Sequence, residues 1–241
     1  MEPRTYRHWV EGKNLISFNV AVKETDLYIR ASSNLKRKAH RLVLKYRCQL
    51  EGYIEQHPTF LTSLKPISIP DDAPHMVKLM AEAAQKARVG PMAAVAGAMA
   101  EFVGTELLAF SPEVIVENGG DIFLKSLGKR IVGIYAGKSP LTGKIGLEIN
   151  GETTPLGICT SSGTVGHSLS YGRADAVVVL SQSTTLADTA ATAIGNLIKQ
   201  PGDIPNGIEL AKGIEGVKGA VIIIGNDMGL WGEVKICPTY K

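Results

Sequence analysis

The spacing of hydrophobic and polar residues changes several times along the 241-residue chain, and each spacing predicts an element. Residues 16–31 alternate between apolar and polar positions, which predicts two strands joined by a turn near residues 23–26. Apolar residues from Leu35 onward recur instead at helical spacing. They predict an amphipathic helix that continues to about Ile54 and carries a basic outer face.

Prolines between positions 58 and 74 predict an extended connection after this helix. Asp71 or Asp72 is placed to cap the next helix, with Pro74 in its first turn. Gly90-Pro91 is then expected to end it.

The segment from Met92 to Leu108 predicts a third helix with almost no bulk on one side. Its small residues are Ala93, Ala94, Ala96, Gly97, Ala98, Ala100 and Gly104. A glycine inside a helix costs about 1 kcal/mol relative to alanine, so an interaction must offset two of them. Close packing against another element and the approach of a flat ligand are both open explanations.

From residue 113 onward the pattern predicts mainly strands. A strand over 113–117 runs through Asn118-Gly119-Gly120-Asp121 into 122–124, which indicates a hairpin, and segments 130–136 and 144–149 are expected to extend its sheet. Further strands are expected at 155–159, 174–181 and 219–225, with a helix over 186–199 capped by Ser183, Thr184 or Thr185. Strands that cluster in hairpins favour an α+β fold, and we expect one domain over residues 1–241.

Composition changes this picture little. The chain is 44% hydrophobic and 20% charged, as in an ordinary globular protein, and no apolar run reaches the length of a membrane helix. The N-terminal residues lack the features of a signal peptide, so we expect a cytoplasmic protein with no membrane partner. The three cysteines, Cys48, Cys159 and Cys237, suggest neither a disulfide framework nor a zinc site.

The net charge of +3 does not predict a nucleic-acid partner. Basic residues nevertheless gather on the first predicted helix. They are Lys36, Arg37, Lys38, Arg41, Lys45 and Arg47. They form either a solvated helix face or a surface that attracts an anionic ligand or an acidic partner.

Three segments carry residues suited to chemistry. In the first, Asn118, Gly119, Gly120 and Asp121, the glycines serve a turn but also let a flat ligand or a phosphate approach the backbone. In the second, Thr160, Ser161, Ser162 and Gly163 offer hydroxyl groups and amides for phosphate oxygens. His167 follows this loop, and its imidazole could act as a base near neutral pH; the alternative is an ordinary Ser/Thr-rich loop with an incidental surface histidine.

The third segment is a helix start containing Asp188 and Thr192, which are four residues apart and therefore share a helix face. A carboxylate and a hydroxyl group there can bind a hard cation such as Mg²⁺. The competing explanation is that Asp188 lies in the first turn of the helix, where a negative charge is favourable anyway.

These segments, in this order, resemble the ApbE superfamily, which is named for a thiamine-biosynthesis lipoprotein and contains the flavin transferases. The matching motifs are Gly119-Gly120-Asp121, Thr160-Ser161-Ser162-Gly163, His167, and Ala187-Asp188 with Thr192. The small-residue helix around Gly97 corresponds to the family's "KGYA" helix. The whole chain looks like a short, cytoplasmic, largely uncharacterised branch of that superfamily.

The resemblance implies a mixed, mainly antiparallel sheet packed with helices, and a flavin nucleotide as the small-molecule partner. In the flavin transferases, FAD is split with Mg²⁺ and FMN is attached to a protein acceptor. Carried over, Asp188 and Thr192 become metal ligands and His167 the catalytic base. Residues 118–121 and 160–163 would line the FAD site.

The chain departs from the family at two motifs. Residues Ser168 to Arg173 follow His167 where the transferases have "DPRTG", and Ala96 or a neighbour stands where "KGYA" has its lysine. Three functions therefore remain open. They are a Mg²⁺-dependent flavin transferase or FAD pyrophosphatase, a non-catalytic flavin- or nucleotide-binding protein, and an enzyme of sulfur metabolism that uses the Cys159 thiol.

Overall fold

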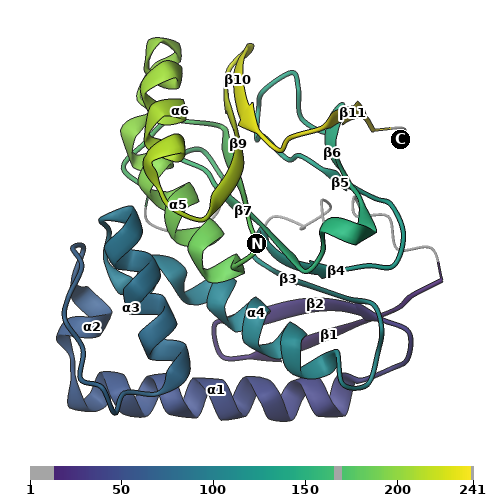
Figure 1. Cartoon of the computed structure of the whole chain (residues 1–241), viewed down its shortest axis with the longest axis vertical. Helices are drawn as coiled ribbons and strands as arrows, with labels where there is room; N and C mark the ends of the chain where they lie inside the picture. The colour runs from purple at the N-terminus through teal and green to yellow at the C-terminus, as the bar shows by residue number, and fades with distance from the viewer. Residues whose placement is uncertain (1–13, 166–169, 240–241) are drawn as a thin grey trace.

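An eight-stranded sheet, in which every neighbouring pair is antiparallel, forms the centre of the molecule (Figure 1). This computed structural model describes residues 14–165 and 170–239. In their spatial order the strands are β1 (Ile16–Val22), β2 (Thr25–Ala31), β3 (Val114–Asn118), β4 (Asp121–Lys125), β7 (Leu156–Ser161), β8 (Ala176–Ser181), β9 (Val217–Ile224) and β10 (Asp227–Gly232).

Helices cover one face of this sheet (Figure 1). They are α1 (Lys36–Gln56), α2 (Thr59–Thr62), α3 (His75–Ala87), α4 (Val95–Leu107), α5 (Thr184–Leu197) and α6 (Ile204–Gly213), with short 3₁₀ turns at Pro91–Ala94, Gly151–Thr153 and Pro201–Asp203. Two hydrophobic clusters join helices and sheet. In the first, Leu27 and Phe123 pack with residues of α1, α3 and α4, and in the second Val177 and Ile222 pack with α5 and α6.

A second, three-stranded sheet covers the other face. Its strands, in spatial order, are β11 (Ile236–Pro238), β6 (Ile145–Ile149) and β5 (Arg130–Gly133). Val132 and Leu147 of this sheet pack against Ile122 and Ile158 of the large one. The arrangement confirms the α+β fold with a mainly antiparallel sheet.

Several details of the sequence prediction are wrong. Strands β5 and β6 do not extend the large sheet, because their buried side chains pack face to face against it. Neither Asp71 nor Asp72 caps α3; Pro74 precedes the helix, and its carbonyl accepts a hydrogen bond from the Lys78 amide at 3.0 Å. The short helix α2, helix α6 and strands β10 and β11 were not predicted.

The small residues of α4 allow close packing on two sides. A Cβ atom at Gly104 would lie 2.2 Å from Cδ1 of Phe123 in the sheet, and one at Gly97 would lie 2.5 Å from the Thr184 carbonyl oxygen of α5. Helix α4 is therefore held against the sheet and against α5 at these positions. Close packing, the first of the two explanations left open by the sequence, accounts for both glycines.

Replacing Gly97 with alanine is expected to destabilise the protein by about 1–3 kcal/mol, since the added methyl group must push α4 away from backbone atoms of α5. Gly52→Ala is a matched control, because Gly52 lies inside α1 and a methyl group added there would meet no atom within 4 Å. That change should be neutral or stabilise the protein by up to about 1 kcal/mol. Chemical denaturation of both variants measures the difference, and equal stabilities would contradict the packing argument.

Candidate functional site

The predicted Asn118–Asp121 hairpin turn is present and is tied to the start of α4. Asn118 and Asp121 pair across β3 and β4, and Gly119 and Gly120 between them have φ angles of 67° and 110°, which favour glycine. The Glu117 carboxylate accepts a hydrogen bond from the Gly120 amide at 3.0 Å. The side-chain amide of Asn118 donates to the Ala96 carbonyl at 3.0 Å, so the turn lies beside the helix start.

Helices α4 and α5 each supply a carboxylate to the other's N-terminal end. Asp188 of α5 accepts a hydrogen bond from the Gly97 amide at 2.8 Å. Glu101 of α4 accepts from the Thr185 amide at 2.8 Å and from its hydroxyl at 2.7 Å, and the Ser183 hydroxyl at the N-cap of α5 lies 3.1 Å away. Negative charge is favourable at both positions because the free amides of a helix start carry partial positive charge.

Asp121 and Asp188 form a buried pair of carboxyl groups on the helix-covered face of the sheet. Their exposed fractions are 7% and 9%. Burial raises the pKa of Asp188 to about 7, against the opposing effect of the Gly97 and Ala96 amides. Burial, followed by the charge of Asp188, raises the pKa of Asp121 well above its usual value. Such a pair is suited to share a proton or to bind a cation.

Cys159 lies between these carboxyl groups and the start of α5. It is fully buried, and its thiol donates a hydrogen bond to the Thr184 carbonyl at 3.3 Å. Burial, followed by the charges of Asp121 and Asp188, raises the pKa of the thiol well above its usual value. A neutral thiol of this kind is a poor nucleophile, so the geometry does not favour the hypothesis of thiol chemistry at Cys159.

The Thr160–Gly163 loop begins at the carboxyl pair and leads outward. The Thr160 amide donates to Asp121 at 3.3 Å, while Ser161 lies against Gly195 of α5. The Ser162 hydroxyl accepts hydrogen bonds from the amides of Thr164 and Val165 at 3.1 and 3.0 Å. Residues 160–162 are half-buried and Gly163 is exposed. The structure thus brings the loop and the hairpin turn together, whereas the predicted base His167 lies outside the described residues.

Among the described residues, few other side chains that could bind a metal accompany the predicted ligands Asp188 and Thr192. Thr192 lies one turn after Asp188 on α5 and is half-buried. Within residues 14–165 and 170–239 there is no cluster of three or more histidine, cysteine, aspartate or glutamate side chains that could hold a metal ion. A cation here would have to combine carboxylate oxygens with hydroxyl, substrate or water oxygens, which is a ligand set that Mg²⁺ accepts.

Two residues that position the site were not predicted. Glu101 carries no motif of its own, and its role depends on α5 lying beside α4. Glu117 is 3% exposed and holds the Gly120 amide, although the sequence suggested only an ordinary strand residue. A glutamate immediately before a two-glycine turn was the one available signal.

The chain is similar to known proteins over most of its length. The family described as "AbpE bacteria" matches residues 7–211. The UPF0280 protein MJ1526 of Methanocaldococcus jannaschii is 42% identical over 221 residues, which are 89% of this chain and 90% of that protein. The UPF0280 protein MK0206 of Methanopyrus kandleri is 42% identical over 228 residues, 91% of each chain.

The fold is similar to those of two solved structures. The apo form of the flavinyl transferase ApbE of Pseudomonas stutzeri superposes with a TM-score of 0.60 at 14% identity, covering 90% of this chain and 94% of that one. The flavin transferase ApbE from Vibrio cholerae gives a TM-score of 0.51, also at 14% identity, with 90% and 96% covered. The chain therefore belongs to the family described as "AbpE bacteria", together with the UPF0280 proteins, and has the fold of the ApbE flavin transferases.

Proposed function

We propose that the protein binds FAD with Mg²⁺ and cleaves its pyrophosphate, passing the FMN group to a hydroxyl group of an acceptor or to water. The observation that carries this proposal is the buried pair Asp121 and Asp188, which lies next to a two-glycine turn and a hydroxyl-bearing loop. The fold and the family membership support it.

The chemistry of the carboxyl pair fits a divalent cation. Both groups are costly to ionise because they are buried, and the charge of Asp188 adds to the cost at Asp121. A cation would offset both effects, and Asp188 with Thr192 would hold it, as the family resemblance implies. When bound, Mg²⁺ would neutralise charge on the pyrophosphate. The Gly119-Gly120 backbone and the hydroxyl groups of residues 160–162 would position the nucleotide.

In the reaction, an acceptor oxygen forms a bond to the FMN phosphorus while the bond to the AMP oxygen breaks. His167 would take the proton from the acceptor hydroxyl, and AMP leaves with the electron pair of the broken bond. A water molecule as the acceptor gives FMN and AMP, and a protein hydroxyl gives a flavinylated protein and AMP.

One sequence feature favours a second candidate, a flavin-binding protein without turnover. Residues Ser168 to Arg173 replace the family's "DPRTG", so the acid and the Thr-Gly pair of that motif are absent from this sequence. The two candidates share the binding site and differ only in whether AMP is released.

Asp188→Asn is expected to weaken FAD binding at least tenfold in the presence of Mg²⁺ and to leave the weaker, metal-free binding unchanged. The asparagine still accepts the Gly97 hydrogen bond but removes the charge that would hold the cation. Flavin fluorescence with Mg²⁺ or with EDTA measures both states. Asp227→Asn, an exposed carboxylate in β10, is the control and should behave as the wild type. Metal-independent binding in the wild type would contradict the role of Asp188.

His167→Asn is expected to retain FAD and Mg²⁺ binding while slowing AMP release by about 10²–10⁴-fold, the usual contribution of a general base. Chromatographic measurement of AMP with purified protein tests it. Full turnover in this variant would mean that another group removes the proton from the acceptor hydroxyl. FAD binding without AMP release in the wild type would establish the non-catalytic candidate.

Without metal, the free energy of unfolding should fall as the pH rises from about 4 to about 7. Folding raises the pKa of Asp188 from 3.8 to about 7, so the folded state binds a proton that the unfolded chain has released across this range. The resulting stabilisation is complete below pH 4 and is lost as the pH passes the folded pKa. At 1.4 kcal/mol for each pKa unit, a shift of about three units corresponds to a stabilisation on the order of 4 kcal/mol.

Urea denaturation in EDTA between pH 4.5 and 7.5 measures this loss. Asp188→Asn should make the decline shallower, because it removes one titrating group and the charge that raises the pKa of Asp121, and Mg²⁺ should reduce the loss in the wild type. An equally steep decline in the variant would assign the pH dependence to other groups.

A further inference from the structure

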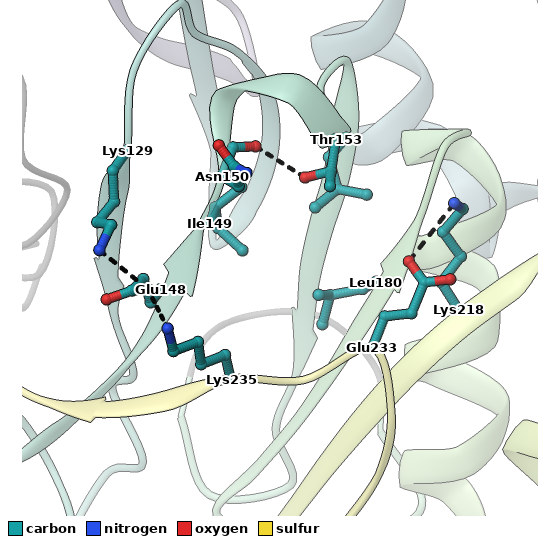
Figure 2. A pocket seen from close by; sticks show the side chains of 10 residues that line it. Lys129, Glu148, Ile149, Asn150, Thr153, Leu180, Lys218, Glu233 and Lys235 are labelled. Atoms are coloured by element: carbon teal, nitrogen blue, oxygen red, sulfur yellow. Dashed lines mark hydrogen bonds and ion pairs between the residues drawn. The ribbon is translucent and has the colours of Figure 1, made fainter.

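A hollow of about 460 Å³ lies on the face of the large sheet opposite the carboxyl pair (Figure 2). It is bordered by the turn before β5, the end of β6 and the turn after it, the start of β7, the end of β8, the start of β9, and the segment that links β10 to β11. Its apolar part is formed by Ile149, Leu156 and Leu180, which come from both sheets and are at most 5% exposed. A hollow of this size accommodates a small organic molecule.

Ionic side chains form two opposite walls of the hollow. On one wall, the single carboxylate of Glu148 contacts two ammonium groups, that of Lys235 at 2.6 Å and that of Lys129 at 3.2 Å. On the other wall, Lys218 lies 3.6 Å from Glu233. Figure 2 shows Leu180 between the two walls. Three lysines thus face two glutamates, and the excess positive charge lies where one carboxylate is shared.

The lysines of the shared wall can change partners at small cost. The side chains of Lys129 and Lys235 are 62% and 70% exposed, whereas that of Glu148 is 18% exposed. Ion pairs that involve exposed lysines are weak, so an incoming anion could take one ammonium group from Glu148 and leave it the other. The apolar side chains form only a narrow floor, and the exposed aliphatic stems of Lys129 and Lys235 supply the rest of the apolar surface.

We propose that this hollow is a second ligand site, which binds a small organic anion with a flat or apolar body. The anionic group would lie between Lys129 and Lys235, and the apolar body would lie along the lysine stems above Leu156 and Leu180. The site is independent of the proposed FAD site, because the large sheet separates them. On β7, Ile158 packs on the side of the hollow and Cys159 on the side of the carboxyl pair.

The test uses 6-fluoro-2-naphthoate as the probe and 6-fluoro-2-naphthalenemethanol as its neutral analogue, with fluorine NMR as the readout. Wild-type protein is expected to bind the naphthoate saturably and the alcohol at least tenfold more weakly. Lys129→Gln/Lys235→Gln should weaken naphthoate binding at least tenfold. Thr153→Trp, which places a bulky ring at the rim and leaves the charges intact, should also weaken it.

Lys138→Gln/Lys212→Gln is the matched control, since it removes the same charge from lysines outside the hollow and should bind like the wild type. Absence of saturable binding to wild-type protein would overturn the proposal. Equal naphthoate affinity in the wild type and in Lys129→Gln/Lys235→Gln would overturn it as well. Lys129→Gln/Lys235→Gln and Thr153→Trp should bind FAD as the wild type does. A failure of the second ligand site is therefore distinguishable from a failure of the proposed FAD site.

Discussion

The reciprocal capping of α4 and α5 is the constraint on which the site depends. The Asp188 carboxylate accepts a hydrogen bond from the Gly97 amide at the start of α4, and the Glu101 carboxylate accepts one from the Thr185 amide at the start of α5. Both contacts require the helix starts to lie side by side, which the missing side chain of Gly97 permits. Asp188 is therefore fixed in direction before any ligand arrives.

This arrangement places negative charge where water is excluded. Asp121 enters the same region from the hairpin turn, and Cys159 fills the space beside it with a neutral thiol. Helix amides stabilise only part of the charge, as the raised pKa of Asp188 shows. A proton or a bound cation would offset the part of the charge that the helix amides leave uncompensated.

The sequence predicted the parts of the fold that depend on local patterns. The hairpin at Gly119-Gly120 and a capping residue among Ser183, Thr184 and Thr185 follow from residue type and spacing; the hairpin is present, and Ser183 is the residue that caps α5. The three-stranded sheet was misplaced, because an alternating pattern shows that a strand is half-buried but not which sheet it joins. Asp188 was identified as a functional candidate, yet its contact with Gly97, 91 positions away, depends on tertiary packing alone.

The two faces of strand β7 pack against different elements. Successive side chains of a strand point to opposite faces, so Gly157 and Cys159 face α5, whereas Leu156 and Ile158 face the small sheet. Side chains that are adjacent in the chain consequently pack against different groups. A substitution at Leu156 can therefore change the lysine-lined hollow while the side chains on the carboxyl side of the strand keep their contacts.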